Sequence, residues 1–124
     1  MAKDRLAGRV VLIVEDEPLV ALEVTAALRA AGARVLTAGY LEAGLFITEH
    51  PELAAAVIDL HLSDGNSTSI CRRLQHLGVP FVVHTGYPSM LPCGERADVP
   101  VISKPARPGR IISALVDLLH SKEQ

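Results

Sequence analysis

Four short apolar runs, separated by stretches with helical spacing, constrain the fold of this 124-residue chain most strongly. They cover residues 10–14, 54–58, 81–84 and 99–103, and they are rich in Val and Ile. None alternates apolar with polar positions, as expected of strands that are covered on both faces. Because parallel strands need crossover connections, we predict an α/β fold with a central parallel sheet.

Helical patterns fill the intervals between these runs. We predict a helix from Pro18 to Gly32, a strand over 34–38, a helix from Leu41 to about His50, a third helix capped by Ser67 or Thr68 and ended by Gly78, and a last helix opened by Pro108. Between Tyr87 and Asp98, two prolines and a glycine break any long helix, so we expect a short turn of helix or an irregular loop. We also expect Gly86 to Ala97 to be the most mobile stretch.

Length and composition indicate one globular domain, residues 1–124, with a core over about 9–120 and short tails. A net charge of −2 gives no bulk reason to expect nucleic-acid or membrane binding. There is no signal-peptide pattern and no run of membrane-span length, so the cytoplasm is the default location. Cys71 and Cys93 are interpreted as reduced thiols.

Polar groups follow each of the four apolar runs, and they suit a Mg²⁺ and phosphoryl site. Glu15, Asp16 and Asp59 are carboxylates at strand ends, where ligands bind in such sheets. Converging carboxylates repel one another unless a cation neutralises them, and an all-oxygen set suits Mg²⁺. Asp59 can then accept a phosphoryl group as an acyl phosphate. Lys104 can pair with a phosphoryl oxygen, and the Thr85 hydroxyl can donate to another.

Each of these residues, taken alone, also has an ordinary structural role as a helix cap, a turn residue or a surface lysine. Their ordered combination is what favours a site. The histidines are given structural roles: His84 in a strand, His76 on the polar face of a helix, and His61 with its ring toward solvent. Only the backbone carbonyl of His61 is placed where it can ligate a cation. The isomer of the Lys104-Pro105 bond is left open, since cis is the minority state.

At these residues the chain resembles the response-regulator receiver domains of two-component signalling, over about Arg9 to His120. The resemblance rests on four motifs, which follow one another in the order found in that family: Val14-Glu15-Asp16-Glu17-Pro18, Ile58-Asp59-Leu60, Thr85-Gly86 and Lys104-Pro105. The resemblance implies a flavodoxin-like doubly wound fold. It has a five-stranded parallel sheet of order 2-1-3-4-5, flanked by five helices, of which the fourth is short or irregular here.

The resemblance also implies roles for the site residues. Asp59 is the phosphoacceptor, Asp16 a direct Mg²⁺ ligand, and Glu15 helps to hold the cation. The backbone carbonyl of His61 completes the protein ligands. Thr85 is the switch hydroxyl and Lys104 contacts the phosphoryl group. The phosphate donor is a phosphohistidine on a sensor histidine kinase.

The chain departs from the usual receiver pattern at two places. Val101 stands where receivers usually have Tyr or Phe. Ser63-Asp64-Gly65 stands where a proline is usual after the phosphoacceptor. The run 80–87 partly resembles a Phe-Ala-Thr-Gly-x-Tyr signature of single-domain receivers paired with HWE-type kinases. Tyr87 is then a candidate for the missing aromatic; alternatively, it packs as a loop tyrosine on the last helix.

We therefore predict a stand-alone receiver, not a substrate-turning enzyme, that switches its contacts with a downstream protein. No effector follows within these residues, so DNA binding is not expected. The alternatives are a kinase-fused receiver, or a binding module that keeps the fold without the switch. A Mg²⁺-dependent phosphohydrolase ranks lower, because His61 stands where such enzymes carry a second acid. A homodimer stays open, since the last helix and fifth strand commonly form dimer contacts in this family.

Overall fold

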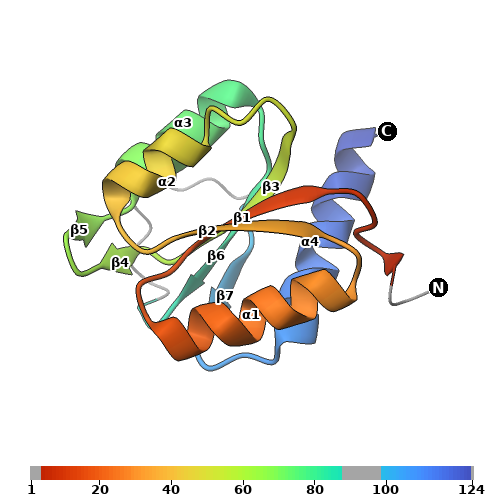
Figure 1. Ribbon diagram of the computed structural model, residues 1–124, viewed down its shortest axis with the longest axis horizontal. Helices are drawn as coiled ribbons and strands as arrows, with labels where there is room; N and C mark the ends of the chain where they lie inside the picture. Colours follow the sequence, from red (N-terminus) through yellow and green to blue (C-terminus); the bar gives the residue numbers. More distant parts are fainter. Residues whose placement is uncertain (1–3, 88–98, 124) are drawn as a thin grey trace.

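A five-stranded parallel sheet forms the centre of the molecule in the computed structural model, which describes residues 4–87 and 99–123 (Figure 1). The strands lie in the order β2-β1-β3-β6-β7, and every pairing between them is parallel. Counted along the chain this is the order 2-1-3-4-5, so the predicted fold class and strand order are confirmed. The main strands are β1 (Val10–Val14), β2 (Arg34–Ala38), β3 (Leu53–Ile58), β6 (Phe81–Thr85) and β7 (Val101–Ser103).

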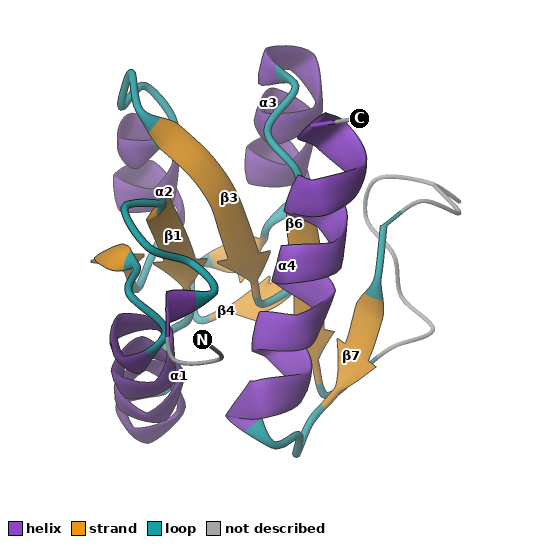
Figure 2. Ribbon diagram, turned by 90° about the vertical axis from the view of Figure 1, so that its right-hand side faces the viewer, coloured by secondary structure: helices purple, strands orange, loops and turns teal. Residues whose placement is uncertain are grey.

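Helices cover both faces of this sheet (Figures 1 and 2). They are α1 (Pro18–Ala30), α2 (Leu41–Ile47), α3 (Thr68–Leu77) and α4 (Pro108–Glu123). Val11 of β1 packs in one core cluster with Leu28 of α1 and Leu115 of α4, whereas Leu12 packs in a second cluster with Leu74 of α3. Because successive strand side chains point to opposite faces, the uninterrupted apolar run of β1 serves both cores.

The segment before β1 is part of the core, not a tail. Leu6 is fully buried in the α1–α4 cluster, and its N–H donates to the carbonyl of Ala31 at 2.8 Å. Gly32 turns at φ +97°, and a Cβ there would lie 2.9 Å from the Cα of Ala7. A glycine is therefore required at this position for both its backbone angle and the close approach of residues 6–8.

Two predicted boundaries were wrong by a few residues. α2 ends at Ile47, because the N–H groups of Glu49 and His50 bond three residues back rather than four, which tightens the chain ahead of Pro51. β7 begins at Val101, not Val99; Pro100 has no N–H to donate to the ladder. The Lys104-Pro105 peptide bond, left open by the sequence, is cis.

A small antiparallel hairpin after β3 was not predicted. β4 (His61–Leu62) pairs with β5 (Gly65–Asn66), and Ser63 and Asp64 connect them. Two-residue strands are too short to leave a periodic signal in the sequence.

Some predictions fall on residues 88–98, which lie outside the described residues. They include the short fourth helix, most of the stretch expected to be mobile, and Cys93. Cys71 is buried in α3. No helix within residues 4–87 and 99–123 has both the length and the apolar character that a membrane crossing requires.

Candidate functional site

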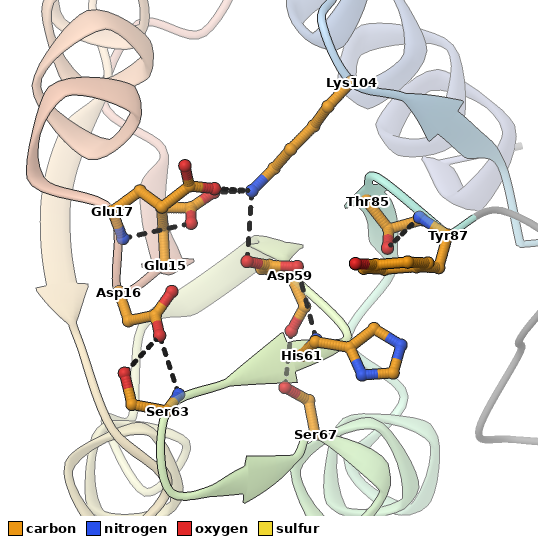
Figure 3. A network of polar contacts seen from close by, with 10 residues as sticks. All are labelled: Glu15, Asp16, Glu17, Asp59, His61, Ser63, Ser67, Thr85, Tyr87 and Lys104. Atoms are coloured by element: carbon orange, nitrogen blue, oxygen red, sulfur yellow. Dashed lines mark hydrogen bonds and ion pairs between the residues drawn. The ribbon is translucent and has the colours of Figure 1, made fainter.

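A half-buried ammonium group joins three carboxylates at the carboxyl ends of β1, β3 and β7 (Figure 3). The Nζ of Lys104 lies 2.8 Å from a carboxylate oxygen of Glu15, 2.8 Å from one of Glu17 and 3.1 Å from one of Asp59. The side chains of Lys104, Glu15 and Asp59 are 15%, 3% and 6% exposed, so two of the three ion pairs are largely withdrawn from water. The predicted meeting of Glu15, Asp59 and Lys104 in one pocket is therefore present.

Glu17 belongs to this acidic cluster, although sequence analysis assigned it no role. Oxygens of Glu15, Glu17 and Asp59 all lie within 4.8 Å of one another. The Glu15 N–H continues the β1–β2 ladder by donating to Ala38, and Glu17 is also extended. The chain bends at Asp16 between them, and the Glu17 N–H donates to the Glu15 Oε2 at 3.2 Å. The bend brings the first and third carboxylates of residues 15–17 together, and it has no periodic signal in the sequence.

Asp16 lies at the bend between Glu15 and Glu17, and its side chain is bound by Ser63. Its Oδ2 accepts hydrogen bonds from the backbone N–H and the hydroxyl of Ser63, at 2.7 and 2.6 Å. Its second carboxylate oxygen points toward Glu15 and Asp59 in Figure 3. The structure thus places Asp16 beside the cluster but bound to the β4–β5 hairpin.

Burial and mutual charge shift the protonation equilibria in the pocket. Burial raises the pKa of Glu15 to about 7, with the Asp59 carboxylate adding to the rise and the Lys104 ammonium opposing it. Burial alone would lower the pKa of Lys104, but its bonds to Glu15, Glu17 and Asp59 outweigh burial and raise that pKa above its usual value. Lys104 is therefore a fixed positive charge, whereas Glu15 can exchange a proton near neutrality.

Backbone hydrogen bonds fix the position of Asp59. Its N–H donates to the Val14 carbonyl at 2.9 Å, and the His61 N–H donates to its Oδ1 at 3.3 Å. The hydroxyl of Ser67, which is fully buried at the start of α3, donates to the Asp59 carbonyl at 2.5 Å. Ser67 was predicted only as a helix cap, and its side chain makes no capping bond. Ser67 thereby holds the loop that follows β3 against the start of α3.

Thr85, Tyr87 and His61 lie on the other side of Asp59. Thr85 is fully buried, and its Oγ1 accepts the Tyr87 N–H at 3.0 Å. The rings of His61 and Tyr87 meet edge to face, 4.9 Å apart at 75°. The expectation that the His61 ring faces solvent was wrong: its Nε2 is buried without a hydrogen-bond partner among the described residues. The edge-to-face contact of Tyr87 is with His61, not the last helix.

The structure also shows the burial of two further residues that the sequence singled out, His84 and Val101. His84, given a structural role, is buried in β6, and burial together with the Lys104 charge lowers its pKa. Val101, in the place usual for an aromatic, is half-buried and packs against the α2–α3 core cluster.

The donor set fits a hard divalent cation. All the grouped side-chain atoms are carboxylate oxygens, the ligand type that Mg²⁺ prefers. A cation already lies among them in the form of the Lys104 ammonium, so the cluster is arranged around positive charge. Glu15, Glu17 and Asp59 are the grouped side chains that would hold such an ion, whereas the roles of Asp16 and the His61 carbonyl as ligands stay predictions.

The chain is similar in sequence and in fold to known response regulators. No family model matches the chain. The phyllosphere-induced regulator PhyR of Methylorubrum extorquens is 29% identical over 118 residues, which cover 91% of this chain and 44% of PhyR. The chain therefore spans less than half the length of this curated relative.

Solved structures match over nearly the whole chain. The response regulator PhyR of Brucella abortus superposes with a TM-score of 0.82 at 24% identity, covering 98% of this chain and 52% of that one. The receiver domain of the sensor histidine kinase PA1611 of Pseudomonas aeruginosa superposes with a TM-score of 0.76 at 20% identity, covering 92% and 99%. That structure contains a magnesium ion coordinated in its active-site cleft. The sheet order and these superpositions show that the chain has the fold of response-regulator receiver domains, and its sequence is similar to the regulator PhyR.

Proposed function

We propose that the chain accepts a phosphoryl group on Asp59, with Mg²⁺, from a phosphohistidine of a sensor histidine kinase. The observation that carries the proposal is the pocket in which the Lys104 ammonium lies 2.8 Å from Glu15 and 3.1 Å from Asp59. An aspartate this buried is of use as a nucleophile only where positive charge offsets its own, and here that charge is built in.

The transfer itself needs little from the protein beyond position and charge. A carboxylate oxygen of Asp59 attacks phosphorus, the P–N bond of the phosphohistidine breaks, and the imidazole leaves with its electron pair and takes up a proton. Lys104 pairs with a phosphoryl oxygen, and the Thr85 O–H, which is not used by the Tyr87 contact, is available to donate to another. Bound Mg²⁺ supplies neutralising charge for the phosphoryl oxygens.

The proposed consequence of phosphorylation is a change in the contacts that the chain makes with other proteins. Thr85 links the phosphoryl site to Tyr87 through the Tyr87 N–H, and Tyr87 is 59% exposed. A change in the Thr85 hydroxyl can therefore alter a side chain that partners can reach. In this proposal the kinase is of the HWE-type group, the exchange occurs in the cytoplasm, and the output is a downstream protein.

The test is phosphoryl labelling by acetyl phosphate, followed by intact-protein mass spectrometry. We expect one phosphoryl adduct when Mg²⁺ is present and none when it is chelated. Asp59→Asn should lose the adduct, and Asp117→Asn, an exposed carboxylate on α4, should retain it. An unlabelled wild type, under conditions that label a control receiver, would contradict the proposal and favour a receiver-fold binding module without this switch.

A further inference from the structure

The β4–β5 hairpin is tied to its surroundings at several points, and one tie reaches a proposed metal ligand. Asp64, in its turn, accepts the Leu41 N–H at 3.1 Å and so links the hairpin to the start of α2. Ser63 binds Asp16 in the loop between β1 and α1. The hairpin therefore links the loop between β1 and α1, which carries Asp16, to the start of α2.

Ser63 makes two hydrogen bonds to the same oxygen of Asp16. The N–H and the hydroxyl of Ser63 both donate to the Oδ2 of Asp16, at 2.7 and 2.6 Å. Hydrogen bonds to an ionised carboxylate are short and roughly twice as strong as neutral ones. The carboxylate is therefore held with one oxygen toward the hairpin and the other toward Glu15 and Asp59 (Figure 3).

A proline cannot make this contact. Receivers usually carry proline at the place of Ser63, and proline has neither an N–H nor a hydroxyl. Both donors to Asp16 would thus be lost if a proline stood at this place.

We propose that Ser63 is a positioning residue for Mg²⁺, which holds the free oxygen of Asp16 in register with the His61 carbonyl. Asp16 and His61 lie on different segments, and Ser63, two residues after His61, connects them. Mg²⁺ demands near-ideal octahedral geometry, so ligands on separate loops bind it well only if their spacing is fixed. Hydrogen-bonded partners of metal ligands typically affect metal affinity by 10–100-fold. The proposal rests on the proposed function, because it takes Asp16 and His61 as ligands.

The test is Mg²⁺ affinity measured by isothermal titration calorimetry on the unphosphorylated protein. Ser63→Ala removes the hydroxyl bond and should weaken Mg²⁺ binding on the order of tenfold. Ser63→Pro removes both donors and should weaken it further. Ser63→Thr keeps both donors and should restore the wild-type affinity. Ser121→Ala, an exposed serine near the end of α4, is the matched control and should bind as the wild type does.

Ser63 is exposed, so urea unfolding of Ser63→Ala should stay close to that of the wild type, which separates positioning from folding. Equal or tighter Mg²⁺ binding by Ser63→Ala would overturn the role of Ser63 while leaving the proposed function intact. Absence of Mg²⁺ binding by the wild type would overturn both.

Discussion

The two sides of Asp59 differ in how completely their polar groups are paired. On one side, the Lys104 ammonium is shared by three carboxylates, two of them nearly inaccessible to water. On the other side, Thr85 has a hydroxyl proton to spare, the Nε2 of His61 has no partner among the described residues, and Tyr87 is largely exposed. The first side holds charge in place, and under the proposed function the second side is the one that responds to phosphorylation.

This contrast divides the site into a chemical half and a responsive half. Ion pairs that are buried and mutually bonded are costly to break, because a lone charge is left without water. Bonds that involve exposed groups are cheap to rearrange. Substitutions on the charged side should therefore lower the stability of the protein strongly. Substitutions on the other side should have small effects on stability and should change mainly the resonances of Tyr87 and His61.

The largest effect is expected from Lys104→Met. This change leaves the buried carboxylates of Glu15 and Asp59 without a counter-charge, and breaking such buried pairs typically costs about 3–5 kcal/mol. Urea unfolding should show most of that loss in chelator, and saturating Mg²⁺ should restore much of it by replacing the charge. Equal stability of Lys104→Met and wild type without metal would remove the basis for a charge-holding half.

The next effect concerns pH. The Glu15 pKa is raised from 4.5 to about 7, so the folded, metal-free protein holds a proton on Glu15 that the unfolded chain releases. Its contribution to stability is thus present below pH 4.5 and is lost as the pH rises through 7. Mg²⁺ must displace this proton, so Mg²⁺ affinity should fall by about tenfold between pH 8 and 6.

Calorimetry in two buffers of different ionisation heat measures the proton released with Mg²⁺. Release of a proton near pH 7 is expected for the wild type and also for Glu23→Gln, an exposed glutamate of α1. Glu15→Gln should show none. Mg²⁺ binding that is independent of pH across this range would contradict the assignment of the exchanging proton to Glu15.

A smaller effect is expected from Thr85→Val, which keeps the shape of the buried side chain. It removes one hydrogen bond, from the Tyr87 N–H, and should cost about 1 kcal/mol. Asp59 should still be labelled by acetyl phosphate, but the shift of the Tyr87 amide resonance on phosphorylation should disappear. A phosphorylation-dependent Tyr87 shift that persists in Thr85→Val would place the coupling elsewhere.

The smallest effect is expected from Tyr87→Ala. The ring is 59% exposed, and an edge-to-face aromatic contact is worth about 0.5–1.5 kcal/mol at most, so its loss should barely move the unfolding midpoint. Labelling of Asp59 should be unaffected, whereas the His61 ring resonances should shift. Loss of phosphoryl labelling in this variant would show that the two halves of the site are not separable.

The sequence was sufficient for β1, β3 and β6 because these strands are largely buried, and their runs of apolar residues leave a clear pattern. It was also sufficient for the pocket of Glu15, Asp59 and Lys104, since parallel strands bring their carboxyl ends to one edge. Glu17 was missed because its role depends on the bend of the chain at Asp16. The hairpin, and with it Ser63, was missed because its strands are two residues long and its contacts are with residues distant in the chain.

The N-terminal packing of Leu6 illustrates a different limit. One leucine in a polar segment has no periodicity, so only the tertiary structure shows that the α1–α4 core has room for it. The half-buried ring of His61 was missed for a similar reason, because it packs against Tyr87, which follows a different strand.

The most direct test of the central claim is chemical mapping of the phosphorylated residue. Borohydride reduces an aspartyl phosphate to homoserine, and peptide mass spectrometry then identifies the position. After treatment with acetyl phosphate and Mg²⁺, homoserine should be found at position 59 alone, and chelation of Mg²⁺ should abolish it. Homoserine at another carboxylate such as Asp16 or Asp64, or none at all, would contradict the assignment of Asp59 as the phosphoacceptor.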